Sequence, residues 1–178
     1  MPPAAAFAEK LNEQIANEFA AHQQYVACAV YYDAEALPQL ARFFYRQALE
    51  ERGHAMMMVQ FLLDTGAEVT TPGVDAPSSR FASTVEPIAL ALAQEQRVSA
   101  QINALAATAR EAGDYSSEQF MQWFIKEQVE EVATMGGLLR VAERAGENAA
   151  AIEEYLAREH LGDEGGDPTA PHPAGAGA

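Results

Sequence analysis

The sequence predicts an all-α protein: an antiparallel four-helix bundle with a long crossover between its second and third helices and a short fifth helix near the C-terminus. The first observation behind this prediction is that apolar residues recur at alternating steps of three and four along four long stretches, the pattern of a helix that faces a bundle core. The second is that only short breaks separate the first stretch from the second and the third from the fourth. Each of these pairs should therefore form an antiparallel hairpin.

Helix-stopping and helix-starting residues place the boundaries of the helices. Pro38 breaks the chain between the first two stretches, and Gly66 occupies the position of a C-terminal stop for the second. Pro87 suits the first turn of the third helix. Ser116 and Ser117, each followed by polar or acidic residues, are N-cap candidates for the fourth. The five helices are expected at residues 4–33, 39–65, 87–112, 116–145 and 147–160.

Residues 67–84 form a connection of about 18 residues that contains Pro72, Gly73 and Pro77 and shows no helical periodicity. At about 3.3 Å per residue, an extended segment of this length can travel the full length of a bundle. It would then set the third helix parallel to the second. We expect one domain over residues 1–161, followed by a flexible tail over 162–178, where Gly, Pro, Ala and acidic residues predominate.

The excess of acidic residues limits the kinds of partner that the protein can bind. The 178 residues include 11 Lys and Arg against 26 Asp and Glu, for a formal net charge of −15. Such a surface repels nucleic acid and anionic lipid, and it concentrates cations. Cys28 is the single cysteine, so no intrachain disulfide can form. With no signal-like N-terminus and no membrane-spanning apolar window, the sequence predicts a cytoplasmic protein that binds neither nucleic acid nor membrane.

Polar residues that can bind metals interrupt all four apolar stripes near their middles. A buried carboxylate without a partner costs several kcal/mol or shifts its pKa, and a metal ion can compensate such a charge. Counted from the two hairpin turns at about 1.5 Å per residue, the interruptions lie at one level within about a turn. A single site inside the bundle is therefore expected. Its candidate residues are Glu18 on the first helix, Glu51 and His54 on the second, Glu95 on the third, and Gln128 and Glu131 on the fourth.

The ligand types favour iron or manganese. The set is rich in carboxylate oxygen, has one imidazole and contains no thiolate, which argues against a structural zinc site. Tyr25 lies seven residues after Glu18 on the same face and could donate a hydrogen bond to a metal-bound carboxylate. An ordinary core tyrosine is an equally good interpretation of Tyr25.

With Glu18, the motif Glu51-x-x-His54 and Glu95 in this order, the chain resembles the ferritin family, specifically its non-haem bacterial members, from the first helix through the fifth. The resemblance implies a ferroxidase centre. Glu18, Glu51 and His54 would hold one iron, with Glu51 bridging, and Glu95 would hold the second. The resemblance also implies roles for six further residues: Gln128 beside the iron pair, Tyr25 as the site tyrosine, and Glu50, Glu127, Glu130 and Glu131 in a further, more exposed iron site.

The same resemblance implies an activity and an assembly. The protein would oxidise Fe(II) with O₂ or H₂O₂ at a di-iron centre and store ferric mineral in a hollow homo-oligomeric cage, which in the family has 24 subunits. A non-catalytic storage or scaffold shell is an alternative, which the intact set of four ligands disfavours.

Three departures from haem-binding and peroxide-scavenging relatives bear on the cofactor. Glu127 is followed three residues later by Glu130, so a second Glu-x-x-His motif is absent from the fourth helix. Glu95 is likewise followed at that spacing by Val98. Arg52 occupies the place where a bacterioferritin presents its haem methionine. We therefore expect no haem, and a di-iron or manganese peroxide-scavenging enzyme is the less favoured alternative.

Overall fold

A computed structural model describes residues 2–146, 148–159, 161 and 167–176. Within these residues the chain forms five α-helices and no strand, which confirms the all-α four-helix bundle. For the first four helices, observed and predicted ends differ by at most one residue, and the predicted ends of the fifth helix, residues 147 and 160, lie outside the described ranges. The helices are α1 (Ala5–Ala34), α2 (Pro38–Thr65), α3 (Glu86–Glu111), α4 (Tyr115–Ala145) and α5 (Ala149–Glu159).

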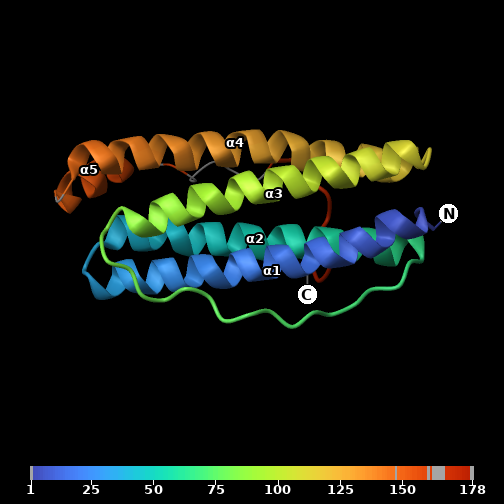
Figure 1. Ribbon diagram of the computed structural model, residues 1–178, viewed down its shortest axis with the longest axis horizontal. Coiled ribbons are helices and arrows are strands. Elements are labelled where there is room, and N and C mark those ends of the chain that lie inside the picture. The colour runs from blue at the N-terminus through green and yellow to red at the C-terminus, as the bar shows by residue number, and fades with distance from the viewer. Residues whose placement is uncertain (1, 147, 160, 162–166, 177–178) are drawn as a thin grey trace.

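The four long helices form two hairpins, α1 with α2 and α3 with α4 (Figure 1). Between them the crossover runs along the length of the α1–α2 hairpin, so α3 starts at the same end as α2 and runs parallel to it, as predicted. Gly66 lets the chain leave α2, because its left-handed φ of 74° suits a residue without a Cβ.

Two amide side chains of α1 fasten the crossover. Asn12 donates to the Glu68 carbonyl at 3.0 Å and accepts from the Thr70 amide at 2.7 Å. Gln24 makes the same kind of paired contact with the backbone of Ser78, at 2.8 and 2.9 Å. Each amide group thereby satisfies a donor and an acceptor of a segment that has no ladder of its own.

The structure shows two N-terminal helix caps that the sequence did not predict, one at α4 and one at α2. The predicted caps Ser116 and Ser117 are wrong, because α4 begins at Tyr115 and Asp114 caps it, accepting from the Ser117 amide at 3.1 Å. The start of α2 is capped from a distance. Glu153 of α5 accepts from the amides of Gln39 and Leu40, at 2.9 and 2.8 Å. This carboxylate ties α5 to the hairpin between α1 and α2.

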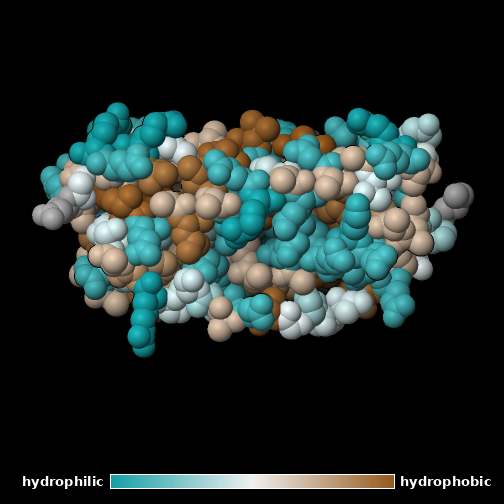
Figure 2. Space-filling model, in the orientation of Figure 1, coloured by the Kyte–Doolittle hydropathy of each residue, from teal (hydrophilic) through white to brown (hydrophobic). Residues whose placement is uncertain are grey.

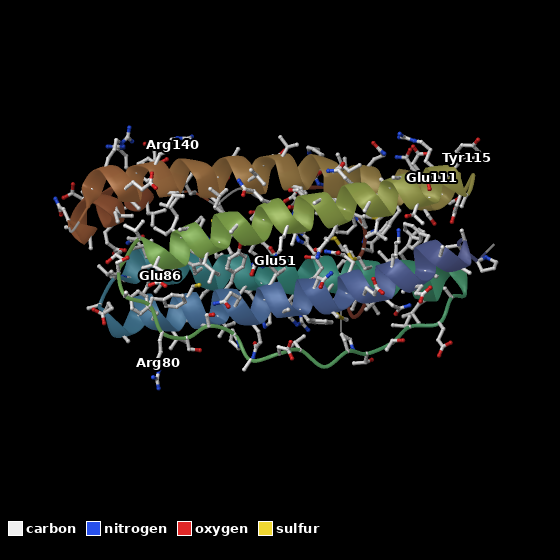
Figure 3. The ribbon with its side chains drawn as sticks, viewed as in Figure 1. Glu51, Arg80, Glu86, Glu111, Tyr115 and Arg140 are labelled. Atoms are coloured by element: carbon white, nitrogen blue, oxygen red, sulfur yellow. The ribbon has the colours of Figure 1, made fainter. Side chains whose placement is uncertain are left out.

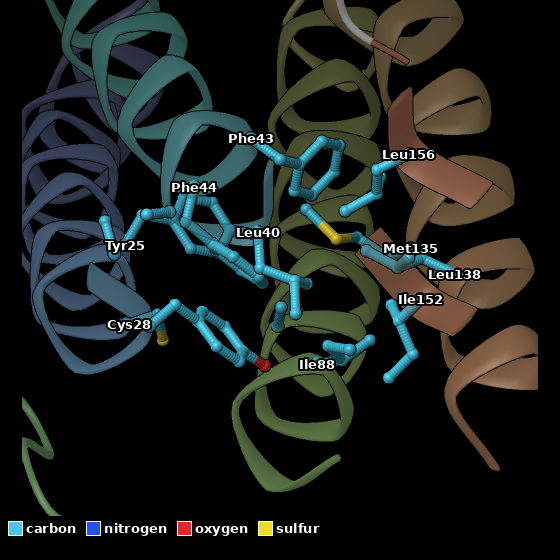
Figure 4. Packing of buried hydrophobic residues seen from close by; sticks show 14 of the residues in the cluster. Tyr25, Cys28, Leu40, Phe43, Phe44, Ile88, Met135, Leu138, Ile152 and Leu156 are labelled. Carbon is cyan, nitrogen blue, oxygen red and sulfur yellow. The ribbon is translucent and has the colours of Figure 1, made fainter. Parts of the chain in front are cut away.

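The apolar core consists of two clusters separated by a polar layer. One cluster lies at the α5 end, where Phe43, Met135 and Leu156 meet from three helices (Figure 4). The other surrounds Leu11 and Phe124 near the opposite end. Neither cluster includes residues 16–24 of α1, 49–57 of α2, 92–97 of α3 or 125–134 of α4. All the polar interruptions of the stripes fall within these four gaps.

The outer surface carries both hydrophilic and apolar residues. Hydrophilic residues cover most of the face in Figure 2, and apolar residues gather over parts of α3 and α4. Among the described residues, no helix combines the length and apolar composition that a membrane span requires.

Candidate metal centre

Four ligand-type side chains from three helices meet in the polar layer. Glu18 projects from α1, Glu51 and His54 from α2, and Glu95 from α3, and their exposed fractions are 1, 1, 4 and 0%. The spacing of three residues between Glu51 and His54 puts both on one face of α2. Figure 3 shows Glu51 near the middle of the bundle, well away from the helix ends.

Three of these residues come close enough to share a cation. Glu18, Glu51 and His54 each offer one ligand atom, and these atoms lie within 4.8 Å of one another. The His54 Nδ1 atom is 3.5 Å from Glu51 Oε2 and 3.9 Å from Glu18 Oε2. These separations are too long for strong hydrogen bonds but leave a space that a small ion can bridge.

The second oxygen of each glutamate is the most informative feature of the layer. Glu18, Glu51 and Glu95 each have a buried Oε2 with no hydrogen-bond partner among the described residues. The first oxygens of two of them are held: Gln14 Nε2 donates to Glu18 Oε1 at 2.8 Å, and the Tyr25 hydroxyl donates to Glu95 Oε1. Tyr25 thus donates to a carboxylate of the layer, and its role beside a bound metal ion stays a prediction. Buried oxygens without donors, two of them beside an imidazole, fit a carboxylate-bound metal ion.

The electrostatics of the layer disfavour the ionised forms of its carboxyl groups unless a cation compensates their charge. Burial raises the pKa of Glu51 well above its usual value, and the neighbouring carboxylates Glu95 and Glu18 raise it further. Burial also raises the pKa of Glu95, although the Tyr25 hydrogen bond acts in the opposite direction. Without a metal, these carboxyl groups therefore hold protons above the pH at which a free glutamate releases them.

Protons and a metal ion compete for the same carboxyl groups, so we expect metal binding to release protons. A cation can occupy the layer only when the carboxyl groups are ionised, so affinity should fall as pH falls, starting above the ordinary glutamate pKa of 4.5. We expect proton release when Zn(II) is added in weak buffer with a pH indicator dye. Glu51→Gln should release fewer protons, and the exposed Glu143→Gln should match the parent. Equal release by the Glu51 variant and the parent would contradict the assignment.

The remaining predicted acids gather beside the layer. A cavity of about 780 Å³ lies between α2 and α4 and is lined by acidic residues and by His54. Its acids differ in exposure: Glu131 is buried, Glu50 and Glu127 are half-buried, and Glu130 is exposed. Burial raises the pKa values of Glu50, Glu127 and Glu131. The structure thus brings together the four acids of the expected further iron site, and their binding of iron remains a prediction.

Gln128, on α4, is buried and accepts a hydrogen bond from the Ser99 hydroxyl of α3 at 3.0 Å. The nearby Gln128 amide also lowers the pKa of Glu95, against the larger effect of burial. Gln128 therefore lies beside the site, as predicted.

One wall of the acidic cavity comes from the C-terminal segment, where the sequence predicted only a flexible tail. Asp167 accepts from Trp123 Nε1 at 3.1 Å and from Lys126 Nζ at 3.2 Å, and the Ala174 amide donates to the Met56 carbonyl at 2.9 Å. The segment has no apolar periodicity that could have predicted these contacts. The described residues 167–176 thus contact α2 and α4, while 162–166 and 177–178 lie outside the description. The predicted flexibility of 162–178 stays a prediction.

Trp123 connects this wall to the metal centre. Its ring lies 5.7 Å from the ring of His54, in an edge-to-face arrangement. It is the single tryptophan of the chain. Its fluorescence can therefore report on events at His54.

A four-helix bundle whose core gathers glutamates and a histidine from three helices belongs to the class of ferritin-like carboxylate metal proteins. Comparisons with known proteins agree. Residues 8–145 match the family model of the ferritin-like domain. The chain belongs to the ferritin family.

Individual relatives cover nearly the whole chain. It is 55% identical to Ferritin BfrB of Mycolicibacterium smegmatis over 165 residues, which are 93% of this chain and 91% of the relative. It is 36% identical to a bacterial non-heme ferritin of Staphylococcus aureus over 154 residues, 86% of this chain and 92% of the relative. An open-pore ferritin from the archaeon Archaeoglobus fulgidus superposes with a TM-score of 0.84 at 28% identity, covering 89% of this chain and 98% of the other.

Proposed function

We propose that this protein stores iron: it oxidises Fe(II) at the centre formed by Glu18, Glu51, His54 and Glu95, and keeps the ferric product inside a hollow shell of its own copies. The observation that carries the proposal is that three glutamates of the buried layer each have an oxygen without a partner among the described residues, and that two of them, Glu18 and Glu51, lie close to His54. Membership of the ferritin family supports the iron chemistry.

The residues of the centre have distinct roles in this reaction. Glu18, Glu51 and His54 bind one Fe(II), and Glu51 with Glu95 binds the second. Tyr25 orients Glu95 through its hydroxyl group. Two Fe(II) ions give up one electron each, which together with two protons reduce O₂ to H₂O₂, or H₂O₂ to two waters. Carboxylates suit this task because they bind both oxidation states of iron.

The acidic cavity between α2 and α4 is the proposed route for the cation. Its acids surround a space that borders on His54, so Fe(II) gathered there lies next to the buried centre. Glu50, Glu127, Glu130 and Glu131 hold iron on this route in our proposal. The formal net charge of −15 raises the local concentration of Fe(II) around the protein.

Exposed apolar side chains on α1 and α2 support self-association. Val30, Leu49 and Leu63 are 53, 66 and 55% exposed, and Tyr45 is 38% exposed on the same hairpin. Such side chains on a bundle surface are typical of an interface. We propose a 24-subunit homo-oligomer, located in the cytoplasm and without haem. Arg52, where a bacterioferritin has methionine, supports the absence of haem.

Two measurements on the unmodified protein test this function. Apo protein given two Fe(II) per chain in air should oxidise them faster than buffer does, and the native particle should have the mass of a large shell that accumulates an electron-dense ferric core. A shell that gathers mineral without fast oxidation would favour the non-catalytic alternative. A monomer or dimer with fast oxidation and no core would favour the peroxide-scavenging enzyme.

A further inference from the structure

Ser99 is a polar residue on the core-facing stripe of α3 that the ferroxidase chemistry above does not use. It lies one turn after Glu95, and its hydroxyl donates to Gln128 Oε1 of α4 at 3.0 Å. Gln128 is only 5% exposed, so its amide has few alternative partners. Ser99 thus controls which end of a buried amide remains for the metal centre.

The two ends of the Gln128 amide are chemically opposite. Oε1 accepts hydrogen bonds and can bind a metal ion, whereas Nε2 only donates. With Oε1 held by Ser99, the Nε2 group is the end of the amide that remains for the neighbouring Glu95 carboxyl group. The Glu95 Oε2 atom stays without a partner among the described residues, so it is available to a metal ion. The hydrogen bond from Ser99 therefore favours one orientation of the amide.

We infer that Ser99 is a positioning residue that holds the carbonyl oxygen of Gln128 in a hydrogen bond, and so prevents Gln128 from serving as an oxygen ligand of the metal. This inference rests on the proposed function and specifies the role of one residue within it. It excludes the ligand role for which the residue pattern made Gln128 a candidate, and it agrees with the place beside the iron pair that the resemblance implied for Gln128.

The space around Ser99 allows its hydrogen-bonding role to be tested without disturbing the packing of the core. Ser99 and Gln128 both line a groove of about 500 Å³ between α3 and α4, together with Ile102 and Val129. Because the groove has free space, removing the hydroxyl need not collapse the core, and an added methyl group has room. The amide of Gln128 would then be free to rotate toward a bound ion.

The test compares Ser99→Ala with Ser99→Thr, which keeps the hydroxyl. Anaerobic Co(II) binding is followed by its visible d–d absorption, which reports the ligand set, and Fe(II) oxidation is followed separately. Ser99→Ala should alter the Co(II) spectrum, because Gln128 Oε1 becomes able to bind, and should slow oxidation by about three- to tenfold. Ser99→Thr should restore both. Gln96→Ala, at an exposed position of the same groove, serves as the control and should match the parent.

A double substitution tests whether Ser99 affects the metal centre only through Gln128. In a Gln128→Leu background, Ser99→Ala should change neither the spectrum nor the rate further, because Ser99 acts only through Gln128. An unchanged spectrum in Ser99→Ala, or an equal effect of that substitution with and without Gln128, would overturn the inference. Failure of the parent itself to bind Co(II) in the buried layer would instead overturn the proposed function, so the two failures are distinguishable.

Discussion

Replacing Glu51 or His54 by alanine should slow the fast phase of Fe(II) oxidation at least about tenfold, equivalent to about 1.4 kcal/mol or more of barrier lowering. Both side chains come from one face of α2, and each brings a ligand atom to the buried cluster with Glu18. Alanine leaves the remaining residues unable to complete the coordination of the first ion. The loss should appear at two Fe(II) per chain, where the centre accounts for the whole signal.

The control for this experiment is Glu143→Ala, which removes an exposed carboxylate from α4. Its rate should match the parent, since general acidity is nearly unchanged. The fluorescence of Trp123 provides a second measurement of metal binding, because a paramagnetic ion bound at His54 should quench it. Unchanged initial rates in the Glu51 and His54 variants would place the chemistry elsewhere.

Replacing Glu95 by glutamine should stabilise the metal-free fold by about 1 to 3 kcal/mol while abolishing fast oxidation. The gain is expected because Glu95 is fully buried beside Glu51 and Glu18, with one oxygen unpartnered. Methionine would pack well on the apolar stripe of α3, but it would leave the buried Tyr25 hydroxyl without its acceptor. Glutamine is the better replacement, because its carbonyl oxygen keeps that acceptor.

The stability gain should depend on pH in a definite direction. The raised pKa values of Glu51 and Glu95 mean that the folded apo protein binds more protons than the unfolded chain above the ordinary glutamate value of 4.5. Its stability therefore falls as pH rises through the raised values. The advantage of Glu95→Gln should be small near about pH 5 and larger near about pH 7.5.

Chemical denaturation after exhaustive chelation measures this difference. Glu111→Gln, at an exposed position of the same helix, should shift stability by no more than about 0.5 kcal/mol. Adding Zn(II) should stabilise the parent more than the Glu95 variant, because only the parent keeps the full ligand set. A Glu95→Gln apo protein less stable than the parent would show that this carboxylate carries no strain.

The sequence predicted the helices and the level of the site because both depend on local periodicity. Glu18, Glu51 and Glu95 each interrupt an otherwise apolar stripe, and counting residues from two short turns was enough to align them. The crossover direction followed from its length alone. These features need no knowledge of side-chain contacts.

What the sequence could not predict depends on contacts between distant segments. Glu153 caps α2 from α5, and Asp167 reaches Trp123 across 44 positions of the chain. Asp114, and not Ser116 or Ser117, caps α4, because its carboxylate accepts from the Ser117 amide. Residue propensities alone do not decide between such adjacent cap candidates. Ser99 fits the helical stripe as a small polar residue, and only its proximity to Gln128 reveals a role.

Anomalous diffraction at the iron edge, from crystals soaked anaerobically in Fe(II), can locate the bound ions. We expect two peaks per chain inside the polar layer, one within bonding distance of Glu18, Glu51 and His54 and the other beside Glu95. Gln128 Oε1 should remain on Ser99. Iron found only in the acidic cavity between α2 and α4, with the buried layer empty, would show that the buried layer is not the iron centre.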